Sequence, residues 1–283
     1  MTRREWLAMV AVAAAHGQTT RIPVGVQLYT VRNLMKKDPD ATLAAIAKIG
    51  YPVVEGGRAE LIGLRPLLKK YKLTTPSVMI DTPLVTREWK AWGVEEVGWD
   101  QTIADLKTLG AKYAVVPYLR PSERKDIPKF IDQMNAAGER FAAAGMAFCY
   151  HNHAFEFGGE EGKRPIDLMF SGFNPKTVFF EADVFWISIA GQDPVEFLDK
   201  HGKRVKLVHL KDKMAGAPVQ YNEAVKPPTF REVGSGSLDF KAILKAAEKA
   251  GVEHYMVEQD QTPGNAIDSL RKSWEHLKSI GAV

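Results

Sequence analysis

The fold class follows from the stretch VFFEADVFW at residues 178–186. An apolar run that begins at Val178 leads directly into Glu181 and Asp183, and the chain becomes apolar again at Val184. A short run rich in branched and aromatic residues predicts a buried β-strand. Ionisable side chains rarely end such a strand without a partner or a function, so Asp183 is a candidate functional residue.

The same pattern of a short apolar run recurs along the whole chain after residue 21. Each run is rich in Val, Ile, Phe and Tyr and is three to six residues long. A longer helical segment follows each run. We expect eight strands, at Val24–Leu28, Val53–Glu55, Thr75–Met79, Tyr113–Val116, Ala147–Tyr150, Val178–Ala182, Val205–Leu210 and Tyr255–Glu258.

Helical periodicity fills the intervals between these strands. Several helices have clear end signals, with an Asp-Pro start at Asp193 or a glycine just after the last apolar turn, as at Gly110 and Gly251. We expect helices at Asp40–Ile49, Leu61–Tyr71, Trp99–Leu109, Ile127–Ala144, Ile166–Phe170, Pro194–His201, Phe240–Ala250 and Ala266–Ile280. Eight strand–helix units predict a single (β/α)8 barrel over residues 21–283. A doubly wound open sheet is the alternative, but no glycine-rich turn follows the first strand.

The composition is that of one globular domain. The chain has 283 residues and 45% hydrophobic content, enough for a large core. Its net charge of +4 is a weak argument for nucleic acid, and we expect no nucleic-acid partner. The lone Cys149 forms no internal disulfide and is expected to be a buried strand thiol. The sequence leaves the oligomeric state open, a homo-oligomer included.

The first twenty residues are typical of an export signal. Arg3 and Arg4 precede the apolar run 7–15, and polar residues 16–18 follow it. This arrangement indicates a twin-arginine signal and a periplasmic location, with an ordinary cytoplasmic extension as the alternative. The run is far shorter than the roughly 20 residues that span a bilayer, so we expect no stable membrane insertion.

Polar residues gather where the last four strands end. The fifth strand runs into HNHAFEF at residues 151–157, the sixth into Asp183, the seventh into His209 and the eighth into Glu258. Active sites of (β/α)8 barrels lie at this end of the strands. Carboxylates and imidazoles that converge there suit one divalent ion, namely Mn²⁺, Mg²⁺, Co²⁺ or Zn²⁺.

With these motifs in view, the chain resembles the xylose isomerase-like barrel superfamily, in particular the group called sugar phosphate isomerases/epimerases. The resemblance covers nearly the whole chain after the signal. The motifs that carry it are GVQLYTVR at 25–32, Glu55, HNHAFEF at 151–157, DVFW at 183–186, HLKD at 209–212, GSGSLD at 234–239 and Glu258.

The resemblance implies a metal site and a reaction class. In relatives that epimerise ketoses, a glutamate, an aspartate, a histidine and a glutamate hold one metal ion. These match Glu156, Asp183, His209 and Glu258, while His151 and His153 are alternatives that could replace or supplement Glu156. The ion would stabilise an enediolate formed from a small sugar-like substrate. Glu156 and Glu258 would then act as bases on opposite faces of the sugar.

Further residues near the strand ends are candidates for substrate binding. Lys211 could bind an anionic group or donate a proton, and Trp186 could form an apolar wall. Glu55 and Glu181 could orient histidine ligands or bind hydroxyl groups. The substrate-binding set is therefore His151, His153, Trp186, Lys211 and Glu55.

The glycine-rich segment 234–236 has two interpretations. The amides of Gly234-Ser235-Gly236 could hold a phosphate group. The same residues could instead form a tight turn in which Ser237 caps the following helix.

Three other functions compete with isomerisation or epimerisation. The same metal and base would serve a lyase or dehydratase acting on 3-keto-glycosides or inososes. Abasic-site endonucleases share the superfamily, but they carry three zinc ions and many histidines, whereas only His151, His153 and His209 are expected at the barrel mouth. A sugar-binding barrel without catalysis is the third alternative.

Overall fold

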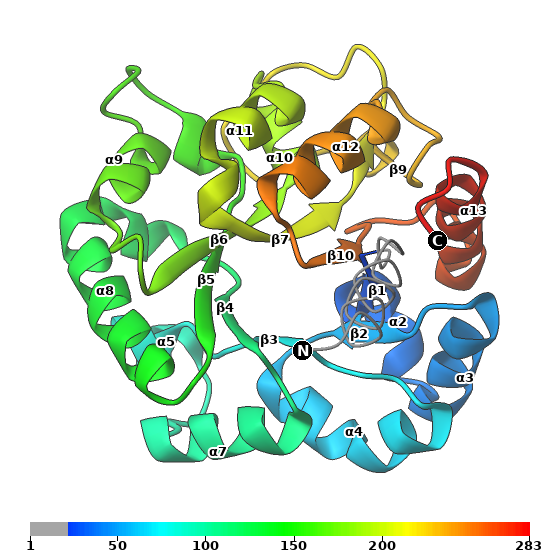
Figure 1. Ribbon diagram of the computed structural model, residues 1–283, viewed down its shortest axis with the longest axis horizontal. Coiled ribbons are helices and arrows are strands. Elements are labelled where there is room, and N and C mark those ends of the chain that lie inside the picture. The colour runs from blue at the N-terminus through cyan, green and yellow to red at the C-terminus, as the bar shows by residue number, and fades with distance from the viewer. Residues whose placement is uncertain (1–21) are drawn as a thin grey trace, which may run out of the picture.

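The computed structural model describes residues 22–283, in which a central sheet of eight strands is surrounded by helices (Figure 1). The strand order is β2-β1-β10-β7-β6-β5-β4-β3, and every ladder between neighbours is parallel. The strands are β1 (Val24–Gln27), β2 (Val53–Glu55), β3 (Ser77–Met79), β4 (Tyr113–Val116), β5 (Ala147–His151), β6 (Val178–Asp183), β7 (Val205–Leu210) and β10 (His254–Val257).

The sheet closes between its outer strands, β2 and β3, through a few backbone contacts. The N–H of Val54 donates to the carbonyl of Thr74 at 2.9 Å, and the N–H of Met79 donates to the carbonyl of Gly56 at 2.9 Å. Only isolated bridges join these two strands. The predicted (β/α)8 barrel is confirmed as a near-closed barrel, and the open doubly wound sheet is wrong.

The outer ring consists of the helices that the sequence predicts, with small shifts at their ends (Figure 1). The carboxylate of Asp126 accepts the N–H of Lys129 at the start of α8, and Asp239 accepts that of Ala242 at the start of α12. The ring contains α3 (Pro39–Ile49), α4 (Arg58–Tyr71), α7 (Trp99–Leu109), α8 (Ile127–Ala143), α9 (Pro165–Gly172), α11 (Pro194–His201), α12 (Phe240–Ala250) and α13 (Ala266–Ser279).

Several elements of two to six residues lie in the loops, where no periodic pattern is long enough to predict them. They are η2 (Leu28–Val31), α2 (Arg32–Met35), α5 (Pro83–Thr86), α6 (Trp89–Trp92), η3 (Pro121–Lys125), η4 (Phe155–Phe157), α10 (Val184–Ile189), η5 (Gly202–Arg204), η6 (Pro227–Thr229) and the antiparallel pair β8 (Asp212–Lys213) and β9 (Phe230–Arg231). Within residues 22–283, no helix combines the length and the apolar character needed to cross a membrane. The predicted export signal lies outside the described residues.

Candidate metal centre

The barrel interior changes from apolar to ionisable along its strands. Side chains two residues apart on a strand share a face, so Leu207 and His209 of β7 both point inward. Leu207 packs with Cys149 in a small apolar cluster, which confirms the buried thiol. His209 lies one pleat nearer the carboxyl end, level with Asp183 of β6. The strand register therefore delivers several ionisable groups to one depth in the barrel.

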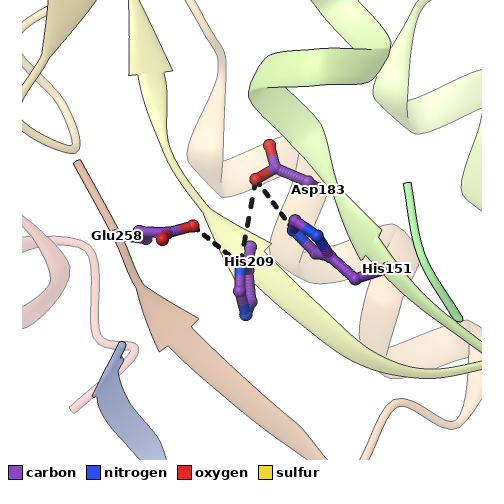
Figure 2. Close-up of side chains that lie close together, drawn as sticks. All are labelled: His151, Asp183, His209 and Glu258. Atoms are coloured by element: carbon purple, nitrogen blue, oxygen red, sulfur yellow. Dashed lines mark hydrogen bonds and ion pairs between the residues drawn. The ribbon is translucent and has the colours of Figure 1, made fainter. Parts of the chain in front are cut away.

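Four side chains at this depth form a group that could hold one metal ion, as Figure 2 shows: His151, Asp183, His209 and Glu258. One donor atom from each lies within 4.8 Å of the others, and all four residues are buried. His151 Nε2 is 3.4 Å from Asp183 Oδ2, which is 3.8 Å from His209 Nδ1. His209 Nδ1 is 3.0 Å from Glu258 Oε2.

These separations fit the donor spacing around a single divalent ion. Nitrogen and oxygen ligands at about 2.1 Å from an ion lie about 3.0 Å apart when they subtend roughly 90° and about 3.8 Å apart when they subtend roughly 130°. Two carboxylate oxygens and two imidazole nitrogens are also a chemically suitable donor set for Mn²⁺, Co²⁺ or Zn²⁺. The residues present therefore fit a divalent metal site.

Each histidine has one ring nitrogen in this group and a second nitrogen held elsewhere. The Nδ1 of His151 is 3.0 Å from the carbonyl oxygen of Pro117, a pure acceptor, so Nδ1 carries the hydrogen and Nε2 faces Asp183. The Nε2 of His209 is 2.7 Å from Glu55 Oε2, so its hydrogen points toward Glu55 and Nδ1 faces the ligand group. Such partners orient histidine ligands and fix their tautomers.

Glu55 lies beneath His209 and not in the cavity that the substrate would enter. Its carboxylate also accepts hydrogen bonds from Gln27 Nε2, at 2.9 Å, and from the Ser77 hydroxyl. Glu181 is close as well, since its Oε1 lies 3.3 Å from His209 Nε2. However, neither carboxylate oxygen of Glu181 has a hydrogen-bond partner within residues 22–283. The position of Glu55 agrees with the orienting role and not with the predicted contact to substrate.

The structure differs from the sequence prediction at Glu156. Strand β5 runs one residue further than expected, so that His151 points inward and takes the place predicted for Glu156. Glu156 lies in η4, where its carboxylate accepts the Tyr150 hydroxyl at 2.7 Å and the N–H of His153 at 3.0 Å. Burial raises the pKa of Glu156 to about 7. A second group that could hold a metal ion consists of Glu55, Glu181 and His209. The Glu156 side chain is engaged within the protein and belongs to neither candidate metal group.

A cavity of about 540 Å³ opens beside the ligand group. His151, His209 and Glu258 line its floor, and His153 and Trp186 line a wall in which their rings lie 5.2 Å apart. Burial lowers the pKa of His153 well below its ordinary value, so this imidazole is neutral at physiological pH. The cavity thus contains most of the predicted substrate-binding residues, with Glu55 the exception.

Lys211 also lines the cavity, although its side chain is almost fully buried. Its Nζ lies 3.0 Å from Asp183 Oδ2, 2.8 Å from Glu258 Oε2 and 2.9 Å from Asp260 Oδ1. Burial alone would lower the pKa of Lys211, but these carboxylates raise it well above its ordinary value. The sequence did not predict Asp260 as a site residue. Its position two residues after Glu258 could have indicated it, because side chains two residues apart in an extended segment share a face.

Glu258 is ionised at neutral pH for a related reason. Burial alone would raise the pKa of this carboxyl group, but the Lys211 ammonium and the His209 ring lower it well below its ordinary value. A carboxylate that faces a cavity and stays charged can accept a proton from a bound molecule.

The glycine-rich loop at 234–239 forms a turn and has no free amides for a phosphate group at its centre. The buried carboxylate of Asp212 accepts backbone N–H groups at 2.7–3.2 Å from Lys213, Gly234, Gly236, Ser237 and Leu238. A Cβ atom on Gly236 would lie within 3 Å of this carboxylate. The cap of the following helix is Asp239 and not Ser237.

Comparison with known proteins places this chain in a family. Residues 43–280 match the family model described as a xylose isomerase-like TIM barrel. The chain belongs to that family. Among solved structures, a sugar phosphate isomerase/epimerase from Parabacteroides distasonis has a TM-score of 0.73 and 24% sequence identity, covering 93% of this chain and 99% of that chain. At this identity the likeness concerns the fold.

Curated relatives of this family member are named inosose dehydratases. One from Geobacillus thermodenitrificans is 30% identical over 158 residues, which are 52% of this chain and 52% of the relative. Another, from Geobacillus kaustophilus, is 26% identical over 260 residues, which are 80% of this chain and 82% of the relative. The chain spans about half the length of several of the curated relatives that it matches. Dehydration was the alternative to isomerisation in the sequence analysis.

Proposed function

We propose that this protein is a divalent-metal-dependent dehydratase that acts on a polyhydroxylated ketone, either a keto-cyclitol or a keto-sugar. The observation that carries the proposal is the convergence of His151, Asp183, His209 and Glu258 beside a cavity that Lys211 also lines. The names of the curated relatives support dehydration as the reaction.

The residues of this chain can divide the work of such a reaction. A bound divalent ion supplies a Lewis acid that polarises a carbonyl group. Glu258 is the first candidate to take the proton from the carbon beside the ketone, and the neutral His153 is the second. The Lys211 ammonium donates a proton to the departing hydroxyl group, which leaves as water as the carbon–carbon double bond forms, and the proton taken by the base later restores the ammonium.

The position of Glu156 favours elimination over epimerisation. An epimerase that uses two bases needs a proton acceptor on each face of the substrate. Glu258 faces the cavity, whereas the Glu156 carboxylate is bonded to Tyr150 and His153 and does not line the cavity. The arrangement therefore offers one carboxylate base from the predicted pair, with a cation beside it for the leaving group.

The donor set also narrows the choice of metal. Mg²⁺ prefers oxygen ligands and keeps several waters, whereas divalent transition-metal ions accept imidazole nitrogen more readily, in the rising order Mn²⁺, Co²⁺ and Zn²⁺. Two histidines among four ligands favour Mn²⁺, Co²⁺ or Zn²⁺ over Mg²⁺. We infer that one such ion is bound per chain.

The experiment is a substrate panel with the full-length protein stripped of metal and then loaded with Mn²⁺, Co²⁺, Zn²⁺ or Mg²⁺. Inososes, 3-keto-glycosides and ketoses are incubated in D₂O and followed by NMR and by the ultraviolet absorbance of a conjugated ketone. We expect a dehydrated product from a keto-cyclitol or keto-sugar, only with metal. Deuterium in an inverted sugar with no loss of water would instead identify an epimerase, and turnover that survives full metal removal would contradict the proposal.

Export is a separate proposal that rests on residues 2–17 of the sequence. If the twin-arginine pathway carries this protein, Arg3→Lys combined with Arg4→Lys will keep it in the cytoplasm of a bacterial host. Cell fractionation of the wild type and the double variant tests this. An unprocessed wild-type chain confined to the cytoplasm would reject the export proposal and leave the enzymatic one unaffected.

A further inference from the structure

The Lys211 ammonium shares its acceptors with the proposed metal site. Its contacts are to Asp183 Oδ2 and Glu258 Oε2, the same oxygens that face His151 Nε2 and His209 Nδ1. A divalent ion held by these oxygens would lie beside a positive charge. Because Lys211 is only 1% exposed, little water is available to screen the repulsion between the two cations.

Asp260 gives this ammonium an acceptor outside the ligand group. Its Oδ1 lies 2.9 Å from Lys211 Nζ, in the segment that follows β10. Asp260 belongs to neither candidate metal group, although it lines the same cavity. It can therefore hold Lys211 while Asp183 and Glu258 direct their oxygens to an ion.

The charges of Lys211 and its three carboxylate partners also indicate a role for Asp260 in ion binding. Asp183, Glu258 and Asp260 contribute three negative charges and Lys211 one positive charge, which leaves two negative charges for a divalent ion to neutralise. Without the Asp260 charge, the ion and Lys211 together would carry one more positive charge than Asp183 and Glu258 balance. Buried ionic groups without compensation are costly, so the carboxylate at position 260 is expected to matter for ion binding.

We propose that Asp260 is a positioning residue of the metal site: it holds the Lys211 ammonium toward the cavity and so permits a divalent ion to bind beside it. This inference rests on the divalent-metal site of the proposed function. Lys211 and Asp260 then have opposite effects on the affinity for the divalent ion. Lys211 weakens ion binding by repulsion, and Asp260 reduces that repulsion.

A double-mutant cycle tests this coupling through binding and not through activity. Mn²⁺ is titrated by calorimetry into the metal-stripped full chain as wild type, Asp260→Asn, Lys211→Met and the double variant. We expect Asp260→Asn to weaken binding about tenfold in the presence of Lys211, and by less than about threefold when Lys211→Met is also present. Lys211→Met alone should tighten binding.

Matched controls separate the coupling from a general loss of charge or of folding. Glu60 also lines the cavity, but the ion pairs of Lys211 are with Asp183, Glu258 and Asp260, so Glu60→Gln should change Mn²⁺ affinity by less than about threefold. Thermal unfolding in chelator shows whether each variant folds. Lys211→Gln, which is neutral but can still donate to Asp260, replaces Lys211→Met if that variant does not fold, with the same expected result.

Two results would overturn the inference and are distinguishable from each other. If Asp260→Asn weakens Mn²⁺ binding equally with and without Lys211, Asp260 acts as a general attractive charge and not through Lys211. If the wild type binds no divalent ion under any condition, the metal site of the proposed function is itself wrong and the inference falls with it.

Discussion

At the scale of single residues, His209 joins the proposed metal site to the buried polar groups beneath it. One ring nitrogen faces Glu258 and Asp183, and the other faces Glu55. Burial alone would lower the pKa of His209, but Glu181 and Glu55 raise it well above its ordinary value. A metal ligand must release the proton from its coordinating nitrogen, so ion binding at His209 releases a proton and weakens as the pH falls.

The Glu55 side chain should set the affinity of His209 for the ion. We expect Glu55→Gln to weaken Mn²⁺ binding by about 10–100-fold, because the carboxylate that accepts the Nε2 hydrogen is lost. Titration calorimetry with metal-stripped protein measures this. Glu181→Gln is the comparison variant. Burial raises the pKa of Glu181 to about 7, so this change removes only part of a negative charge 3.3 Å from the same nitrogen, and it should weaken Mn²⁺ binding less than Glu55→Gln does. Equal losses in both variants would contradict a special role for the Glu55 hydrogen bond.

Glu156 should affect stability through its pKa. A carboxyl group whose pKa rises from 4.5 to about 7 on folding stabilises the protein fully below about pH 4.5, and this stability is lost as the pH rises toward about 7. The loss is at most about 3 kcal/mol. Urea unfolding at pH 5 and pH 8 should therefore show a smaller pH dependence in Glu156→Gln than in the wild type.

The same variant separates a structural role from a catalytic one. We expect Glu156→Gln to retain bound metal and most of its turnover, because Glu156 lies outside both candidate metal groups. A turnover that falls a hundredfold or more with metal retained would restore Glu156 as a base.

At the scale of elements, Asp212 connects the two ends of the long segment between β7 and α12. It receives backbone N–H groups from the loop at 234–238, more than twenty residues further along the chain. We expect Asp212→Ala to lower the free energy of unfolding by about 2 kcal/mol or more, since buried N–H groups would lose a charged acceptor. Chemical denaturation measures the loss, and Asp239→Ala provides a helix-cap control of about 1 kcal/mol. If Asp212→Ala lowered the free energy of unfolding no more than Asp239→Ala does, the connecting role of Asp212 would be contradicted.

The strands and helices could be predicted from the sequence because each depends on a local pattern. β4, α7 and α12 begin and end at the predicted residues, since apolar runs and C-terminal glycines mark their limits. The ligand role of the fifth strand could not be predicted in the same way. It depends on whether the extended geometry of β5 continues as far as His151, which then shares the inward face of Cys149.

Contacts between segments far apart in the chain could not be predicted from the sequence either. The Asp212 carboxylate could be assigned to the glycine-rich loop only when the fold brought the two together. Asp260 could be assigned a role only from its hydrogen bond to Lys211, because the residue type alone does not indicate one. The superfamily resemblance indicated the strand ends that matter, and the structure then selected the side chains that meet there.

At the scale of the whole molecule, the proposed ion joins three neighbouring strands of the barrel and the segment after a fourth. Its donors come from β5, β6, β7 and the residue that follows β10. A ligand that binds only the folded state stabilises it by about 2.7 kcal/mol at a concentration one hundred times its Kd. We expect Mn²⁺ at that concentration to raise the Tm by roughly 5–10 °C over the metal-stripped protein. His209→Ala should abolish this shift, and a shift that persists would locate the ion elsewhere.

The central claim is that one divalent ion is held by His151, Asp183, His209 and Glu258. The most direct test is a crystal of the Mn²⁺-loaded protein measured at the manganese absorption edge, where only the metal gives a strong anomalous signal. We expect one anomalous peak per chain, with nitrogen or oxygen atoms of all four side chains at about 2.0–2.3 Å from it. No peak at this position, or a cluster of three ions, would contradict it.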